Sequence, residues 1–102
     1  MKLRYIDKIR IGATDFDIIW DSKRDGGEFS YRNKKLVIGT NHRTIVEILD
    51  TIIHELKEMI HIEQWTRFDD GSSTGQYMFV YNHDRHDELC SRLAGLLEQF
   101  II

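Results

Sequence analysis

The first third of the chain follows the two-residue period of strands. Apolar and polar residues alternate over 9–13, and residues 16–20 are rich in β-branched and aromatic side chains. The predicted elements are a strand region over 3–20 with a turn at Thr14-Asp15, a polar loop over 21–28, and a hairpin formed by 29–33 and 35–38.

After Gly39 the period changes to that of a helix. Thr44 and Glu47 match a capping box, and apolar residues then recur at three- and four-residue intervals. This pattern predicts a helix that begins at Thr44, or earlier at Thr40 or Asn41, and runs to about Arg67. Its expected apolar stripe comprises Ile45, Val46, Ile48, Leu49, Ile52, Ile53, Leu56, Met59 and Ile60. A loop over 68–75, a strand over 76–81 and a second helix over about 84–100, capped by Asn82 or Asp84, complete the prediction.

The second helix has its own apolar stripe. The side chains expected on its buried face are Leu89, Cys90, Leu93, Leu96, Leu97 and Phe100. The element order β-β-β-α-β-α favours an α+β fold: a small antiparallel sheet packed by a long central helix and a C-terminal helix. A chain of 102 residues is expected to form a single domain over 1–102.

Composition narrows the class of protein. The net charge of −3, from 14 basic and 17 acidic residues, argues against a non-specific nucleic-acid partner. No window approaches the roughly 18 apolar residues of a membrane span, and the first residues lack the apolar run of a signal peptide. The single cysteine, Cys90, rules out an internal disulfide, so we expect a cytoplasmic protein.

Candidate chemistry is concentrated in the segment His54-Glu55-Leu56-Lys57-Glu58. On a helix, side chains four residues apart share one face, so His54 and Glu58 are spaced to hold one metal ion. Glu55 would then serve as general base toward a metal-bound water. The segment is a His-Glu-x-x-Glu variant of the His-Glu-x-x-His motif.

The helical wheel leaves two interpretations of this segment open. Glu58 falls about 40° and Leu56 about 200° from His54, so the His54 face lies opposite the apolar stripe. An ordinary solvated helix face would have the same pattern. A metal site requires the second helix to cover this face, and His86 is expected near the centre of that helix's apolar stripe, with His83 nearer its edge. His86 is therefore either a core histidine with a polar partner or a third ligand, with His83 as the alternative.

Two further residues, His61 and Cys90, carry side chains that can bind a metal. His61 lies about 10.5 Å along the helix from His54, which is too far for a shared ion. We expect it to lie on the substrate side, to support a metal ligand without binding the metal, or to be exposed. Glu58 and His61 match the Glu-x-x-His spacing of di-iron bundles, but the second such motif is missing. Cys90 is expected to be a small buried hydrophobe.

The motif helix, the small sheet before it and the segment His83-Asp84-Arg85-His86 after it together resemble the small zincin-like metallopeptidase-type proteins of phages and prophages. The closing pattern over 93–97, Leu-Ala-Gly-Leu-Leu, is also similar. The resemblance implies zinc, or another divalent metal, held by His54, Glu58 and a residue of the last helix, with Glu55 as general base. The departure is Glu58, which stands where zincins usually have a second histidine and makes the ligand set more anionic.

These observations lead to two main hypotheses. The first is a metal-dependent hydrolase of peptide type, with His54, Glu58 and His86 (or His83) on the metal, Glu55 as base, and a peptide or protein as substrate. The second is a non-catalytic interaction or assembly module of phage origin on the same scaffold. A purely structural metal site with four protein ligands is a third, weaker alternative. Neither a nucleic-acid nor a membrane partner is expected.

Overall fold

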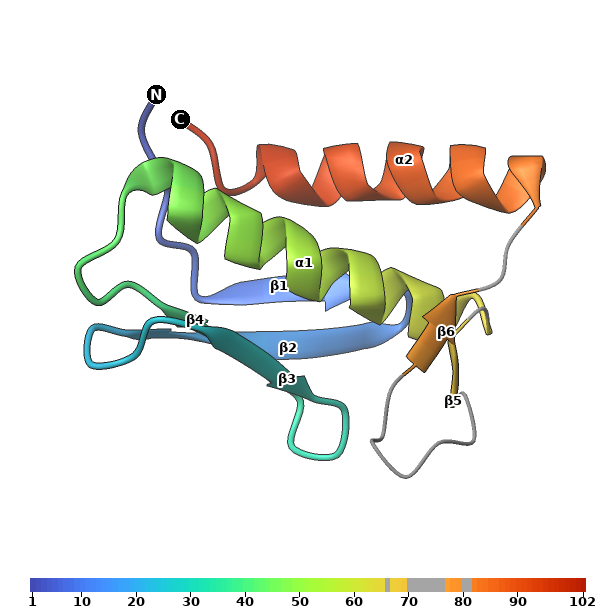
Figure 1. Cartoon of the computed structure of the whole chain (residues 1–102), viewed down its shortest axis with the longest axis horizontal. Coiled ribbons are helices and arrows are strands. Elements are labelled where there is room, and N and C mark those ends of the chain that lie inside the picture. Colours follow the sequence, from blue (N-terminus) through green and yellow to red (C-terminus); the bar gives the residue numbers. More distant parts are fainter. Residues whose placement is uncertain (66, 70–76, 80–81) are drawn as a thin grey trace.

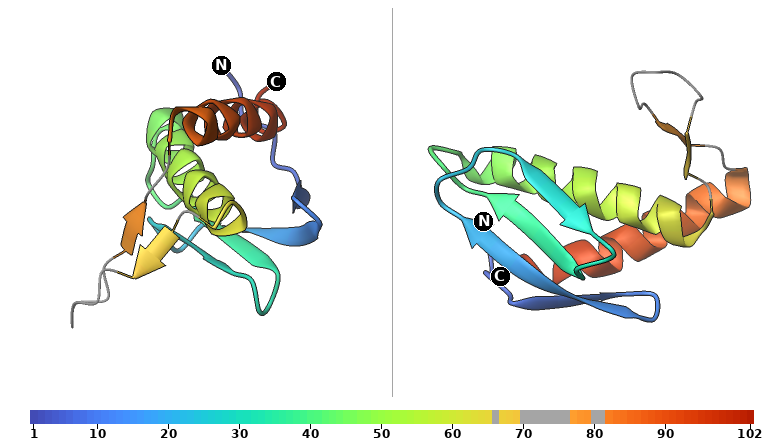
Figure 2. Two further views of the ribbon diagram at one scale, coloured as in Figure 1. Left: turned by 90° about the vertical axis from the view of Figure 1, so that its right-hand side faces the viewer. Right: turned by 90° about the horizontal axis from the view of Figure 1, so that it is seen from below.

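A computed structural model describes residues 1–65, 67–69, 77–79 and 82–102 of the chain. The fold is α+β, as predicted: a four-stranded sheet is packed by two helices, and a second sheet of two short strands lies near the end of the first helix (Figure 1). Both helices lie on the same side of the larger sheet (Figure 2).

The larger sheet is mixed rather than antiparallel, which corrects the prediction. Its strands are β1 (Lys8–Ile11), β2 (Thr14–Asp21), β3 (Gly27–Ser30) and β4 (Lys35–Gly39), in the order β1-β2-β4-β3. The β1–β2 and β3–β4 pairs are antiparallel, whereas β2 and β4 are parallel, with Ile18 opposite Leu36. The parallel pair arises because β3 folds back on the outer side of β4, which leaves β4 beside β2.

The alternation of the strands places most of their apolar residues on one face, with Ile19 and Val37 on the other. Helix α1 (Ile45–Glu63) covers the first of these faces and is preceded by the predicted capping box of Thr44 and Glu47. The main apolar core comprises Leu3, Ile9, Ile11, Phe16, Ile18, Leu36, Ile38, Ile48, Ile52, Leu56, Met59 and Phe100. Burying each Leu or Ile side chain contributes about 1.5–3 kcal/mol. Two residues of the predicted stripe are instead exposed, Ile45 at 41% and Val46 at 74%.

Helix α2 (His83–Glu98) runs back alongside α1 in the opposite direction (Figure 1). Asn82 is its N-cap, and its side chain accepts a hydrogen bond from the backbone N–H of Arg85 at 3.0 Å. Leu89 is its one buried residue, while Leu93, Leu96 and Leu97 are half-buried and Cys90 is exposed, contrary to expectation. Neither described helix has the length and apolarity that crossing a membrane requires.

Helix α1 ends earlier than predicted. Gln64 is its C-cap, and Trp65 adopts a positive φ of 60°, which stops the helix. Strand β5 (Arg67–Asp69) then pairs with β6 (Tyr77–Phe79) in antiparallel fashion. Within the predicted loop and strand, residues 70–76 and 80–81 lie outside the described residues.

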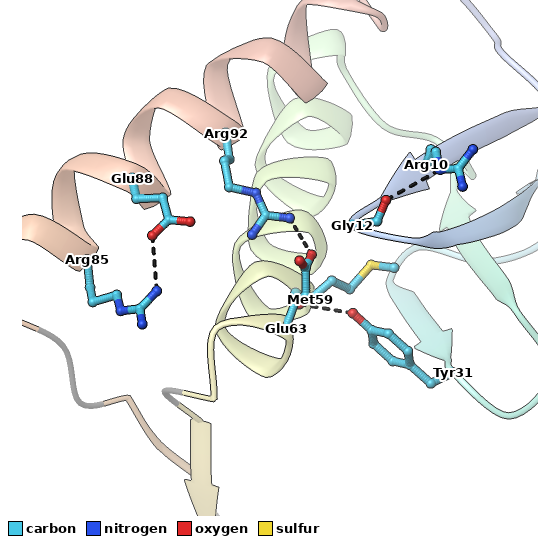
Figure 3. A network of polar contacts seen from close by, with 8 residues as sticks. All are labelled: Arg10, Gly12, Tyr31, Met59, Glu63, Arg85, Glu88 and Arg92. Atoms are coloured by element: carbon cyan, nitrogen blue, oxygen red, sulfur yellow. Dashed lines mark hydrogen bonds and ion pairs between the residues drawn. The ribbon is translucent and has the colours of Figure 1, made fainter.

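A polar network ties the two helices to the sheet (Figure 3). The Arg92 guanidinium on α2 forms an ion pair with Glu63 at the end of α1. The Tyr31 hydroxyl donates a hydrogen bond to the Met59 carbonyl oxygen at 3.0 Å. Burial raises the pKa of Tyr31 to about 12, with the Glu63 carboxylate as the next cause. The phenol is therefore a neutral donor throughout the physiological range.

The two chain ends lie side by side (Figure 1). Leu3 and Ile101 form an antiparallel bridge. The backbone N–H of Arg4 donates to the Phe100 carbonyl oxygen at 2.7 Å, and that of Ile102 donates to the Lys2 carbonyl oxygen at 3.0 Å. These contacts hold the buried Phe100 ring over the core at this end of the molecule.

Candidate functional site

Two of the predicted site residues are neighbours on α1. The His54 Nε2 atom lies 3.8 Å from Glu58 Oε2, as the four-residue spacing requires. The His54 side chain is 72% exposed, whereas that of Glu58 is only 18% exposed. The two side chains therefore lie at the border between solvent and a covered region.

The cover over Glu58 comes from the small sheet and not from α2. Arg67 of β5 places its Nε atom 3.3 Å from Glu58 Oε1 and has a side chain that is 16% exposed. Its guanidinium carbon lies 3.5 Å from the centre of the Tyr77 ring and 5.8 Å from that of Phe29. Arg67 therefore links the small sheet both to α1 and to strand β3.

Glu55, the predicted general base, points toward β3. A Cβ atom at Gly27 would lie 3.3 Å from Glu55 Cγ and 2.6 Å from Thr51 Cγ2, so the absence of a side chain at Gly27 lets α1 approach the strand. Glu55 is buried, at 7% exposure. Burial raises the pKa of its carboxyl above the ordinary value, the neighbouring His54 opposes this, and the Glu58 carboxylate adds to it.

His61 is buried, so the alternative that it is an exposed residue is wrong. Its ring lies 4.6 Å from that of Phe79 on β6, and its Nε2 atom is 3.2 Å from Lys57 Nζ. Burial, and secondarily the Lys57 charge, lower the pKa of His61 to about 4. The small sheet therefore packs along the polar face of α1 that the sequence analysis had assigned to α2 or to solvent.

The α2 candidates lie elsewhere. His83 is exposed, and its Nδ1 atom is 3.3 Å from Asp87 Oδ2 one turn along the same helix. His86 is also exposed, with Nε2 at 3.7 Å from Cys90 Sγ. The expectation that His86 occupies the centre of a buried face is wrong, because residues 83–88 form an exposed part of α2.

The positions of these side chains show whether they fit the metal that the resemblance implies. His54 and Glu58 offer two donors, but across the described part of the chain no group of three or more His, Cys, Asp or Glu side chains is placed to hold a metal ion. Glu58 instead has the cation of Arg67 beside it, 3.3 Å from Oε1. The described residues therefore do not fit a mononuclear site with three protein ligands.

Strand β3 lies at the edge of the larger sheet beside Glu55, and among the strands that the structure describes only β4 pairs with it, so we call its other side the free edge. The Gly39 N–H donates to the Gly26 carbonyl oxygen at 2.7 Å, and Glu28 and Ser30 lie opposite Val37 and Lys35. In an antiparallel ladder, hydrogen-bonded pairs alternate with non-bonded pairs, so the backbone groups of Gly27 and Phe29 point away from β4.

The other face of β3 carries a hollow. It has a volume of about 260 Å³ and is lined by Glu28, Phe29, Ser30, Asn33, Lys35 and Val37. The free edge of β3 is therefore flanked by Glu55 on the helix side and by this hollow on the outer side.

The sequence analysis missed Arg67, Phe29 and Gly27 as members of this region. Arg67 had been assigned to the end of the helix, and β5 has only three residues, too few for a recognisable period. Gly27 did offer a signal, because a glycine next to a strand often marks a close backbone approach.

Comparisons with family models, with curated proteins and with solved structures give no match to this chain.

Proposed function

We propose that this chain is a non-catalytic interaction module that binds an extended peptide segment by adding it as a further strand to β3. The observation that carries the proposal is the free edge of β3, where Gly27 and Phe29 direct backbone N–H and C=O groups away from β4. Such an edge is a template for a fifth strand, and β-strand addition is a common mode of peptide recognition.

The surroundings of the edge support selective binding. Side chains of an added strand alternate between its two faces. One set would face α1 and meet Glu55, and the other would face the hollow next to Glu28 and Ser30. In this proposal, α1 with its His-Glu-x-x-Glu segment lies against β3, the strand that receives the peptide. This pairing of the motif helix with the small sheet is the part of the chain that resembles zincins.

A matched pair of variants tests the proposal. Phe29→Pro removes the N–H at the free edge without removing a bond to β4, and proline is tolerated at edge strands. Phe29→Ala removes the same ring but keeps the N–H. On arrays of random-sequence capped heptapeptides, we expect the wild-type chain and Phe29→Ala to bind a common set of peptides and Phe29→Pro to lose them. Circular dichroism checks that both variants fold.

The binding mode has a second test. In a peptide taken from that set, methylation of backbone nitrogens at alternate positions should abolish binding for one register and spare the other, because an added strand bonds through every second residue. Equal binding by Phe29→Pro and Phe29→Ala, or equal effects of both methylation registers, contradicts strand addition.

The metal-dependent hydrolase is the competing candidate, although the described residues place no third ligand with His54 and Glu58. The observation in its favour is the burial of Glu55 beside that pair, which raises the pKa of its carboxyl. This candidate predicts that a fluorogenic peptide library is hydrolysed in added zinc, with activity lost in Glu55→Gln but kept in the control Asp50→Asn, which changes an exposed carboxylate of the same helix. Strand addition predicts no hydrolysis. If zinc neither binds nor shifts the Tm, this candidate fails while strand addition is untouched.

A further inference from the structure

The two oxygens of Glu58 have different partners. Oε1 lies 3.3 Å from Arg67 Nε, and Oε2 lies 3.8 Å from His54 Nε2. Two donors bound to one tetrahedral zinc lie roughly 3.3 Å apart, given metal–ligand bonds near 2.0–2.2 Å. The His54–Glu58 pair is thus close to the spacing of two metal ligands, with a guanidinium on the remaining carboxylate oxygen.

Arg67 is held in place chiefly by aromatic rings. The Tyr77 ring lies 3.5 Å from its guanidinium carbon, with the Phe29 ring on the β3 side at 5.8 Å. Its Nε atom is buried and, within the described residues, has no hydrogen-bond partner of good geometry. The contact with Glu58 is therefore an ion pair that rests on charge and stacking rather than on a hydrogen-bonded fork.

We propose that Arg67 is a built-in cation that pairs with the second carboxylate oxygen of Glu58 and thereby keeps the His54–Glu58 pair from binding a divalent metal ion. The inference goes beyond peptide binding at β3 and holds whether or not β3 takes a peptide. It concerns the ligand pair of the hydrolase candidate. A divalent ion on Glu58 would sit beside the fixed positive charge of Arg67, in a partly covered region where charges are weakly screened.

The test removes the charge and retains the length of the side chain. Arg67→Met can still pack on Tyr77, and Arg67→Lys keeps a positive charge as the matched control. By isothermal titration with zinc, and separately with nickel, we expect Arg67→Met to bind at least tenfold more tightly than the wild-type chain. Arg67→Lys should stay close to wild type. Adding His54→Ala to Arg67→Met should return the affinity to the wild-type level.

A different outcome overturns the inference. If a folded Arg67→Met binds zinc no more tightly than the wild-type chain, the guanidinium does not oppose metal binding at the His54–Glu58 pair. If circular dichroism shows that Arg67→Met does not fold, Tyr77→Ala replaces it. Tyr77 is half-exposed, and removing its ring loosens the stacking on Arg67, so this variant should also bind zinc more tightly than the wild-type chain. Zinc binding by Arg67→Met without peptide hydrolysis supports the inference and separately counts against the hydrolase candidate.

Discussion

The Glu63 carboxylate lies against Gly12, so closely that no side chain fits between them. A Cβ atom at Gly12 would be 2.4 Å from the carboxyl carbon of Glu63. Gly12 also has a φ of 62°, the left-handed region that glycine adopts without strain. Because Glu63 is in turn paired with Arg92, this single contact joins the β1–β2 turn to both helices (Figure 3).

Gly12→Ala is expected to destabilise the fold. The left-handed backbone alone costs a non-glycine residue about 1–2 kcal/mol, and displacement of Glu63 adds to this. Urea unfolding measures the change in the free energy of unfolding. The control is Gly95→Ala on α2, where nothing lies within 4 Å and the higher helix propensity of alanine should stabilise the chain by about 1 kcal/mol. Effects of the same sign at both positions would contradict the argument.

The burial of His61 gives stability a pH dependence with a definite sign. Its pKa is about 4 in the folded chain against 6.5 for an ordinary histidine, so the unfolded chain takes up the proton first as the pH falls. The free energy of unfolding should therefore decline between about pH 6.5 and about pH 4. The gap between the two pKa values corresponds to at most about 3 kcal/mol.

Two variants separate this effect from other titrating groups. His61→Leu keeps a buried apolar contact with Phe79 and should flatten the pH dependence in urea unfolding, whereas His54→Leu changes an exposed histidine of the same helix and should not. Glu55 acts in the opposite direction, because a raised pKa favours proton uptake by the folded chain as the pH falls. An unchanged slope in His61→Leu would refute the assignment.

Gln64 is a buried polar residue whose replacement by an apolar one should stabilise the fold. Its side chain is 7% exposed, and both its oxygen and its nitrogen lack a hydrogen-bond partner among the residues that the structure describes. Leaving such groups unpaired costs about 1–3 kcal/mol. Gln64→Met should therefore raise the free energy of unfolding, measured in urea, by an amount of this order. Gln99→Met, at the exposed C-cap of α2, is the control and should change stability by less than about 0.5 kcal/mol.

The helices were predictable where local signals act. The capping box at Thr44 and the cap at Asn82 fix both helix starts through contacts three residues away in sequence. The period of α1 predicted Ile48, Ile52 and other core residues correctly. It failed for Val46, because the period tells which way a residue points but not how far the covering sheet extends.

The sheet and the candidate site depend on pairings that the sequence does not encode locally. Parallel pairing of β2 with β4 requires β3 to choose the outer side of β4, which no short pattern indicates. The pairing of β5 with β6 brings Arg67 to Glu58 and Phe79 to His61, across gaps of 9 and 18 positions along the sequence. The polar character of His54, Glu58 and His61 could be read from the sequence, whereas the element that covers Glu58 and His61 could not.

The His86 prediction failed for a related reason. His86 is on the same side of the helix axis as Leu93, which packs against the core. However, the first two turns of α2 are exposed, so His86 has solvent on the face that the wheel marked as apolar. A wheel gives orientation about the helix axis, whereas burial also depends on position along it.

Because residues near the two chain ends are paired, a short linker could join the ends and make the backbone circular. With the bridge between Leu3 and Ile101 already in place, a short Gly-Ser link from residue 102 to residue 1 would need to span little distance. The ring could then be reopened in the exposed turn between Arg32 and Asn33, giving a circular permutant whose core contacts are all retained. In such a chain β4 would come first and β3 last, and the edge proposed to receive a peptide would be next to the new terminus.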